Sequence, residues 1–140
     1  MDLPAIIALL ADDEIGAARE TPDDREPYEA SFGAIDADPN QLLAVGERGG
    51  QVVATVQVTF IPGLSRRGTW RAQIEGVRVA SSARGAGLGE SLVWWAIEQA
   101  RGRGCALVQL TSDARRQQAH RFYGRLGFEA SHTGFKLALT

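Results

Sequence analysis

The sequence has a single cysteine, Cys105, and a single lysine, Lys136. One cysteine excludes an intrachain disulfide and a zinc site built from cysteines. Because Cys105 precedes the apolar run ALVQL, we expect it to be a small buried residue. No stretch approaches the roughly 20 consecutive apolar residues of a membrane-spanning helix, and the first residues lack the basic region of a signal peptide. These absences predict a cytoplasmic protein with no membrane partner.

Strong charge of either sign is also missing. The formal net charge of the 140 residues is −2, which argues against nucleic-acid binding, because domains that bind nucleic acid are usually basic. The basic residues are almost all arginine, and the planar guanidinium suits contact with phosphate or carboxylate. The length predicts one domain, residues 1–140, with room for one core.

Hydrophobic periodicity predicts alternating helices and strands. We expect helices over residues 2–13, 24–37, 87–102 and 113–131, a hairpin of two strands over 41–63, and further strands over 69–80, 105–112 and 133–140. Gly49 and Gly50 mark a hairpin turn, and residues 64–68 read as a polar loop. In the helix over 87–102, Leu88, Leu92, Trp95 and Gln99 form the expected stripe, flanked by Val93, Ala96 and Ala100. The order predicts an α/β fold with a mixed, mostly antiparallel central sheet flanked by helices, and a parallel pair joined by the helix over 87–102.

The strand over 69–80 changes phase in its middle. Trp70, Ala72 and Ile74 occupy even positions, whereas Val77 and Val79 occupy odd ones, and Gly76 lies between the two sets. A phase change at a glycine is what a β-bulge leaves in a sequence. We therefore predict a bulge at Gly76.

The segment SSARGAGLGE, residues 81–90, places alternating glycines before a helix. It lacks the lysine of a P-loop and the glycine spacing of a dinucleotide-binding fingerprint. It does match Arg-x-x-Gly-x-Gly at Arg84, Gly87 and Gly89. A helix start with free N–H groups favours an anion. The residues alone leave two alternatives, a phosphate-binding loop or a tight turn without a ligand.

The sequence resembles the Gcn5-related N-acetyltransferase family. The match rests on VRVASSARGAGLGESLV and, about 30 residues later, on AHRFYGRLGFEA. The resemblance implies that acetyl-CoA is the cosubstrate and that no metal is needed. It also implies that the bulged strand splays from the next strand, and that the acyl-pantetheine lies in that gap. The implied cofactor-binding residues are Val77, Arg78, Val79, Arg84, Gly85, Ala86, Gly87, Leu88, Gly89, Glu90 and Arg116.

The resemblance also implies two catalytic residues. Tyr123 corresponds to the tyrosine that protonates the leaving thiolate; taken alone, it would read as a core aromatic. Glu75 corresponds to a glutamate that takes the proton of the amine, often through water; taken alone, it would read as a surface glutamate paired with Arg71 or Arg78. A backbone N–H of Val77 or Arg78 would polarise the thioester carbonyl. His120 is a weaker candidate on the helix of Tyr123.

The chain departs from the family pattern at two places. The family usually has a strand before its first helix, whereas this sequence begins at the helix, so that strand is missing or the recorded start is late. An unpaired edge could weaken the neighbouring strand, or a partner subunit could cover it in a homodimer. Arg116 stands where many members have asparagine in the pantetheine region. Acidic residues in the first two helices would suit an amine, and Arg66 with Arg67 would suit an amine that carries a phosphonate or a carboxylate. The alternative, which the residues alone favour, is that each of these runs is a solvated surface.

The resemblance therefore implies an enzyme that moves an acetyl group from acetyl-CoA to a primary amine of a small molecule, by direct attack in a ternary complex. The alternative is a non-catalytic acyl-CoA-binding sensor. A third reading, an interaction or nucleic-acid-binding domain, is disfavoured by the charge.

Overall fold

The computed structural model describes residues 2–140. These residues form two compact units, one that ends at Gln109 and one that comprises Leu110–Thr140. The helices are α1 (Leu3–Leu10), α2 (Glu14–Arg19), α3 (Glu26–Ala37), the single turn α4 (Ser65–Gly68), α5 (Leu88–Gly102) and α6 (Gln117–Arg125), with a 3-10 turn η1 (Ser81–Ala83). The strands are β1 (Gln41–Arg48), β2 (Gln51–Pro62), β3 (Trp70–Val79) and β4 (Leu107–Leu110). A single domain over residues 1–140 stays a prediction.

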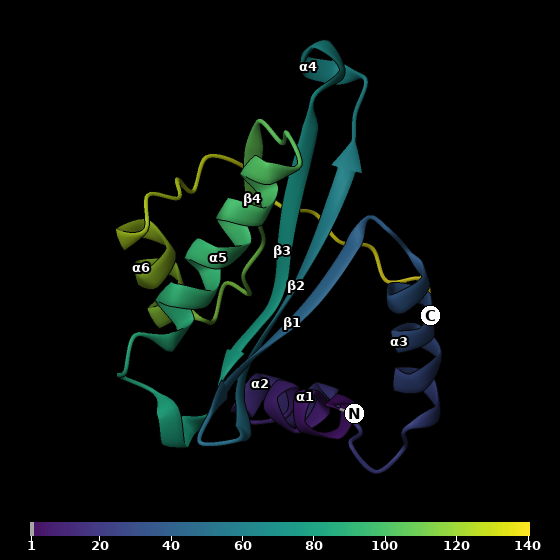
Figure 1. The fold of residues 1–140 in the computed structure, drawn as a ribbon, viewed down its shortest axis with the longest axis vertical. Helices are drawn as coiled ribbons and strands as arrows, with labels where there is room; N and C mark the ends of the chain where they lie inside the picture. The colour runs from purple at the N-terminus through teal and green to yellow at the C-terminus, as the bar shows by residue number, and fades with distance from the viewer. Residues whose placement is uncertain (1) are drawn as a thin grey trace. The chain divides into compact units, whose positions relative to one another are not determined.

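The four strands form one open sheet in the order β1-β2-β3-β4 (Figure 1). β1, β2 and β3 are antiparallel neighbours, and the predicted glycine turn joins β1 to β2. The Ala106 N–H donates to the carbonyl of Trp70, and Gln109 bonds Gln73. In both pairs the two residues are 36 positions apart in the sequence. A constant separation means that both strands advance in the same direction, so β4 runs parallel to the first half of β3. The mixed sheet with one parallel pair agrees with the sequence-based prediction.

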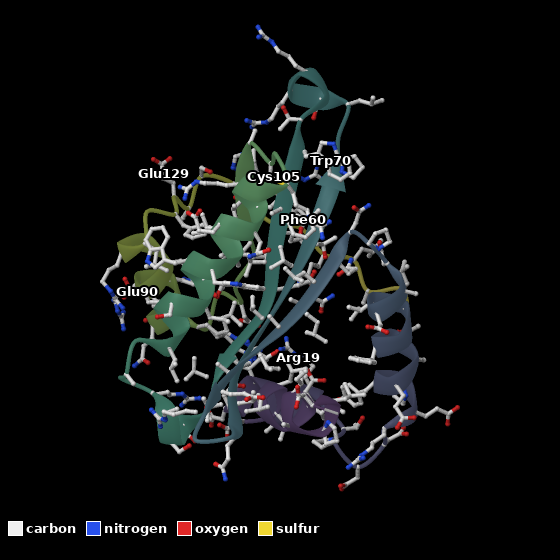
Figure 2. The ribbon with its side chains drawn as sticks, viewed as in Figure 1. Arg19, Phe60, Trp70, Glu90, Cys105 and Glu129 are labelled. Carbon is white, nitrogen blue, oxygen red and sulfur yellow. The ribbon has the colours of Figure 1, made fainter. Side chains whose placement is uncertain are left out.

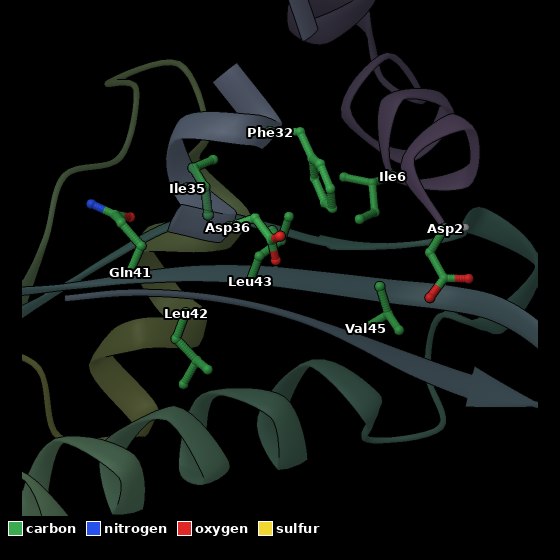
Figure 3. A pocket seen from close by; sticks show the side chains of 9 residues that line it. All are labelled: Asp2, Ile6, Phe32, Ile35, Asp36, Gln41, Leu42, Leu43 and Val45. Carbon is green, nitrogen blue, oxygen red and sulfur yellow. The ribbon is translucent and has the colours of Figure 1, made fainter. Parts of the chain in front are cut away.

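The two faces of the sheet differ in polarity. On one face Val58 pairs with Ile74 and Phe60 with Ala72, and all four side chains are buried. α5 covers this face. In Figure 3, α5 lies on one side of the sheet, and α1 and α3 lie on the other. Residues that pair directly share a face, so Gln57 and its partner Glu75 belong to the other face, which α1 and α3 flank.

The inner surface of α5 corrects the predicted stripe. Val93, Ala96 and Ala100 are buried, whereas Trp95 is 39% exposed. Small residues allow the helix to approach the sheet closely, and the bulky Trp95 fits only at the margin of that contact. Apolar periodicity alone could not separate the two adjacent stripes.

The corner between α1 and α2 was not predicted from the sequence. Asp13 is the N-cap of α2, and its Oδ1 accepts a hydrogen bond from the Gly16 N–H at 2.6 Å. A Cβ atom on Gly16 would lie 2.0 Å from the backbone oxygen of Leu10. Only glycine therefore allows this close approach between the two helices.

In the second unit, the predicted C-terminal strand is absent from the structure. The predicted helix is present as α6, but residues 133–140 form no strand. Phe135, Leu137 and Leu139 are 92%, 85% and 91% exposed. Alternating apolar residues indicate which face of a strand would be buried. A strand also needs a neighbouring strand for its backbone hydrogen bonds, and alternation does not identify that neighbour. Among the helices of residues 2–140, none is long and apolar enough to cross a membrane.

Candidate active site

β3 contains one extra residue where it passes β2. Gln57 pairs with Glu75 and Thr55 pairs with Arg78, so two steps along β2 face three along β3. Gly76 has φ +64°, a left-handed conformation that glycine adopts with little strain. This geometry is a β-bulge with glycine at its left-handed position. The predicted bulge at Gly76 is confirmed.

The end of α1 lies beside the bulge. A Cβ atom on Gly76 would be 3.8 Å from Cδ2 of Leu10. Just beyond α1, Asp12 Oδ2 accepts hydrogen bonds from both the N–H and the hydroxyl of Ser81, each at 3.2 Å. The α1–α2 corner is therefore tied to both the bulge and the end of β3.

The glycine loop that follows η1 is open to solvent. Arg84, Gly85, Ala86 and Gly87 are all exposed. Gly85 and Gly87 have φ of +85° and +76°, and a Cβ atom on either would meet no atom within 4 Å. Backbone conformation, rather than lack of space, therefore requires glycine at these two positions.

The N-terminus of α5 is available to an anion. Gly87 is its N-cap and supplies no side-chain hydrogen bond. The first N–H groups of a helix have no intrahelical acceptor, and the helix dipole adds to their preference for negative charge. Glu90, seen at the start of α5 in Figure 2, has its Oε1 3.3 Å from the Trp94 indole nitrogen. Its carboxylate is thus bonded one turn along the helix. This geometry fits a diphosphate such as that of coenzyme A.

Hydrogen-bonded polar side chains lie on the sheet face flanked by α1 and α3. The amide of Gln109 donates to Oε1 of Gln73 at 3.1 Å, and the amide of Gln73 lies 3.5 Å from Oε1 of Glu75. On the neighbouring strands, Gln41 accepts from Gln57 and Thr59 at 3.0 and 3.1 Å. Glu75 is exposed, so its carboxylate has both a positioning partner and access to water. It does not form an ion pair with Arg71 or Arg78 within the described residues.

In the second unit, α6 carries Tyr123 among aromatic rings. Its ring packs edge-on against Phe122 and Phe128, with centroids 5.1 and 5.7 Å apart. The side chain is half-buried. Such edge-to-face contacts fix the ring plane, so the phenol has a defined orientation within this unit.

The other predicted residues of the second unit lie at the start of α6. Arg116 is the N-cap residue and is half-buried. His120 Nε2 lies 2.9 Å from the carbonyl of Asp113, which engages one ring nitrogen locally. Arg115 donates two side-chain hydrogen bonds to the Asp113 carboxylate. These bonds, together with the Arg115 N–H, hold the pKa of Asp113 well below its ordinary value.

Cys105 is half-buried rather than fully buried. Burial raises the pKa of its thiol, and the charge of Arg103 opposes this only in part. A thiol with a raised pKa is a poor nucleophile at neutral pH. This favours direct transfer over a covalent acyl-cysteine.

The predicted site residues are divided between the two units of the chain. Glu75, the bulge and the glycine loop follow one another along β3, η1 and the start of α5. Tyr123 and Arg116 belong to the second unit. Whether Tyr123 and Glu75 meet at one substrate stays a prediction.

Comparison with known proteins identifies the chain's relatives. A family model described as the acetyltransferase (GNAT) family matches residues 3–128. The chain belongs to the GNAT family of acetyltransferases. It is 34% identical over 116 residues to the aminoalkylphosphonate N-acetyltransferase of Salmonella typhimurium, covering 83% of this chain and 75% of that protein.

Solved structures agree with this assignment. A transcriptional regulator from Bacillus halodurans C-125 is 48% identical, with a TM-score of 0.94 and coverage of 99% of this chain and 93% of that chain. A candidate acetyltransferase from Agrobacterium tumefaciens str. C58 is 31% identical, with a TM-score of 0.86 and coverage of 98% and 93%. The family match and the curated N-acetyltransferase relative identify this GNAT protein as an acetyltransferase enzyme.

GNAT acetyltransferases use acetyl-CoA as cosubstrate. Within residues 2–140, no group of three or more histidine, cysteine, aspartate or glutamate side chains is arranged to hold a metal ion. Sequence analysis missed the glutamines that accompany Glu75. A signal was present, since Gln57, Gln73 and Gln109 each interrupt an apolar strand.

Proposed function

We propose that this enzyme transfers the acetyl group of acetyl-CoA to the primary amine of a small molecule that also carries a phosphonate or phosphate group. One observation carries the proposal: in a chain of the GNAT family, a glycine bulge in β3 leads into an uncapped glycine loop at the start of α5. The similarity to an aminoalkylphosphonate N-acetyltransferase supports the acceptor class.

The backbone from Arg84 to Glu90 would hold the diphosphate of the cosubstrate. Gly85 and Gly87 keep this backbone in left-handed conformations, and the α5 N-terminus supplies unpaired N–H donors. The bulge interrupts the ladder at Val77, so backbone groups of Val77 and Val79 are the ones we assign to the pantetheine amides. A backbone N–H of Val77 or Arg78 would polarise the thioester carbonyl. When bound, the cosubstrate supplies the activated acyl group.

Two proton transfers are needed, and the chain offers one residue for each. Glu75, oriented by Gln73 and open to water, would accept a proton from the acceptor ammonium, directly or through one water. Tyr123 would donate its phenolic proton to the leaving thiolate. Each such group contributes about 10²- to 10⁴-fold to the rate. A covalent enzyme intermediate is not required, which is consistent with the raised pKa of Cys105.

We assign the phosphonate or phosphate to Arg78 rather than to Arg66 and Arg67. Arg78 pairs with Thr55, and Glu75 pairs with Gln57 two positions along β2, so Arg78 and Glu75 share a face. The hairpin tip is too remote. Trp70 to Gly76 alone spans about 20 Å of strand, and Arg66 and Arg67 precede Trp70. A small acceptor with its amine at Glu75 cannot reach them.

A panel of paired amines tests the function. Each aminoalkylphosphonate is compared with the alkylamine of the same length that lacks the phosphonate, and free thiol is measured after addition of acetyl-CoA. A charge-assisted bond to arginine predicts a preference of about 10- to 100-fold in kcat/KM. Arg78→Gln should abolish that preference, and Arg67→Gln should leave it intact. If no amine releases CoA although acetyl-CoA raises the Tm, the proposal of small-amine transfer is wrong.

A further inference from the structure

Two consecutive aspartates at the α1–α2 corner bond to different parts of the chain. Asp13 caps α2, the helix that follows it, through the N–H of Gly16. Asp12 bonds instead to Ser81, which lies 69 positions further along the sequence. In Figure 1 this corner lies beside the tip of the β3 arrow, where the chain enters η1. Asp12 therefore joins the N-terminal helices to the segment that leads into the glycine loop.

The turn η1 has no side-chain cap of its own, and Asp12 supplies one. Ala80 is the N-cap residue of this turn and forms no side-chain hydrogen bond. The N–H and the hydroxyl of Ser81 both donate to Oδ2 of Asp12, each at 3.2 Å. The first N–H groups of a helical turn have no acceptor inside the turn, and a carboxylate oxygen satisfies them well. Asp12 thus caps η1 from a distant position in the sequence.

The sheet holds η1 from its other side. The N–H of Ala80 donates to the carbonyl of Val53 on β2 at 2.7 Å. Arg48, at the end of β1, donates to the carbonyl of Ser82 at 3.4 Å. Among these contacts, the bonds to Asp12 are the ones that come from the helices. η1 is therefore held between the sheet and the α1–α2 corner.

The glycine loop depends on this turn for its position. Gly85 and Gly87 have left-handed φ values, and a Cβ atom at either would meet no atom within 4 Å. Packing around these two glycines therefore does not fix the loop, which is held at its two ends, by η1 and by the start of α5. A site that spends only a fraction of its time in the binding conformation has an apparent Kd raised in inverse proportion to that fraction. Loosening η1 should accordingly weaken binding at the loop.

We propose that Asp12 is a positioning residue for the cosubstrate, which holds the start of the glycine loop in the conformation that binds the diphosphate. Asp12 has this role only if the proposed function is right, because that function places the diphosphate at the loop. The role requires an acceptor oxygen rather than a negative charge, since one oxygen accepts both bonds from Ser81. Asparagine should therefore replace Asp12, and alanine should not.

The sign of the effect separates positioning from charge. A carboxylate close to a site for an anion opposes binding by Coulomb repulsion. If charge were the main influence of Asp12, its removal would tighten the binding of acetyl-CoA. If positioning is the main influence, removal of the side chain weakens that binding although a repulsive charge has gone.

Calorimetric titration with acetyl-CoA, without an acceptor, tests the role. Asp12→Ala should raise the Kd about 10-fold through the loss of two hydrogen bonds, whereas Asp12→Asn should keep it within about threefold. Ser81→Ala retains the N–H donor and should raise the Kd about threefold. The double variant should be no weaker than Asp12→Ala alone, because both changes break the same contact. Asp23→Ala is the matched control, since Asp23 is exposed in the turn between α2 and α3, and its Kd should equal that of the wild type.

Two further measurements distinguish this role from a general loss of stability. The KM for acetyl-CoA should rise with the Kd in Asp12→Ala, while kcat at saturating acetyl-CoA stays near the wild-type value. In the free protein, amide hydrogen exchange of Ser81–Glu90 should be faster in Asp12→Ala, and exchange in β2 should be unchanged. Equal acceleration in both segments would mean that Asp12 only stabilises the fold, and it would overturn the positioning role.

Binding of acetyl-CoA to the wild type separates a failure of this role from a failure of the proposed function. If the wild type binds and Asp12→Ala binds as tightly or more tightly, the positioning role is wrong and the proposed function stands. If the wild type does not bind acetyl-CoA, both are wrong. Should Asp12→Ala fail to fold, Ser81→Ala decides, and an unchanged Kd in that variant overturns the role.

Discussion

Gly16 at the α1–α2 corner gives the sharpest stability prediction. A Cβ atom there would lie 2.0 Å from the Leu10 carbonyl oxygen and 2.8 Å from Oδ1 of Asp13. The first contact is with backbone, which cannot rotate away, so Gly16→Ala must move α1 from α2 and weaken the Asp13 cap. Overpacking costs about 1–3 kcal/mol, and loss of a cap about 1 kcal/mol. We expect Gly16→Ala to lower the free energy of unfolding by about 2–4 kcal/mol.

Gly33→Ala is the matched control for this substitution. Gly33 lies inside α3 (Glu26–Ala37), where a Cβ atom would meet nothing within 4 Å. Alanine in an open helical position stabilises by about 0.5–1 kcal/mol relative to glycine. Urea unfolding of both variants should therefore give changes of opposite sign. If Gly16→Ala unfolds at the wild-type urea midpoint with an unchanged m-value, the close approach of α2 to the Leu10 carbonyl is wrong.

Three further predictions concern the bulge, the second unit and the chemistry. Gly76→Ala forces a left-handed conformation on alanine and should destabilise by about 1–2 kcal/mol; calorimetry measures this, and an unchanged Tm would contradict the bulge. Asp113 has a lowered pKa, so its pairing with Arg115 stabilises the folded protein fully above the ordinary aspartate pKa of about 3.9. This contribution is lost as the pH falls through the lower pKa of the folded state. NMR titration of Arg115→Gln should show the Asp113 pKa raised relative to the wild type, and an unchanged pKa would exclude the pairing. Tyr123→Phe should lower kcat by about 10²-fold or more with little change in the affinity for acetyl-CoA; equal rates would reject Tyr123 as the acid.

The sequence predicts the sheet and its bulge because both depend on local rules. Alternation at Val56, Val58 and Phe60 fixes a strand face, and the change of phase at Gly76 fixes the bulge. The C-terminal segment, residues 133–140, shows the limit of the same rule. Its alternation is as regular as that of β2, yet it forms no strand, because the partner of a strand is set by tertiary or quaternary contacts that periodicity does not encode.

For the site, the sequence predicts the glycine loop well and the surroundings of Glu75 poorly. Gly85 and Gly87 have the positive φ values that make glycine necessary, and such a requirement is visible in the residue type. The contacts of Glu75 are with Gln73 and, through it, Gln109 on β4. Gln109 lies 36 positions from Gln73, so only the parallel pairing of two strands brings them together. The pairing of Glu75 with Arg71 or Arg78, one alternative that local spacing offered, is not among the ion pairs of residues 2–140.

The bulge links the fold to the proposed chemistry, because it changes which face of β3 each following side chain occupies. Glu75 and Arg78 are three positions apart, so in a regular strand their side chains would lie on opposite faces. Arg78 would then point toward α5, into the apolar layer of Ile74 and Val93, where an unpaired charge is strongly destabilising. The extra residue at Gly76 reverses the alternation, so Arg78 pairs with Thr55 and shares the polar face with Glu75, while Val79 pairs with Ala54 on the apolar face. One glycine thus keeps the core apolar on both sides of the bulge and places Arg78 on the same face as the carboxylate that we assign to the amine.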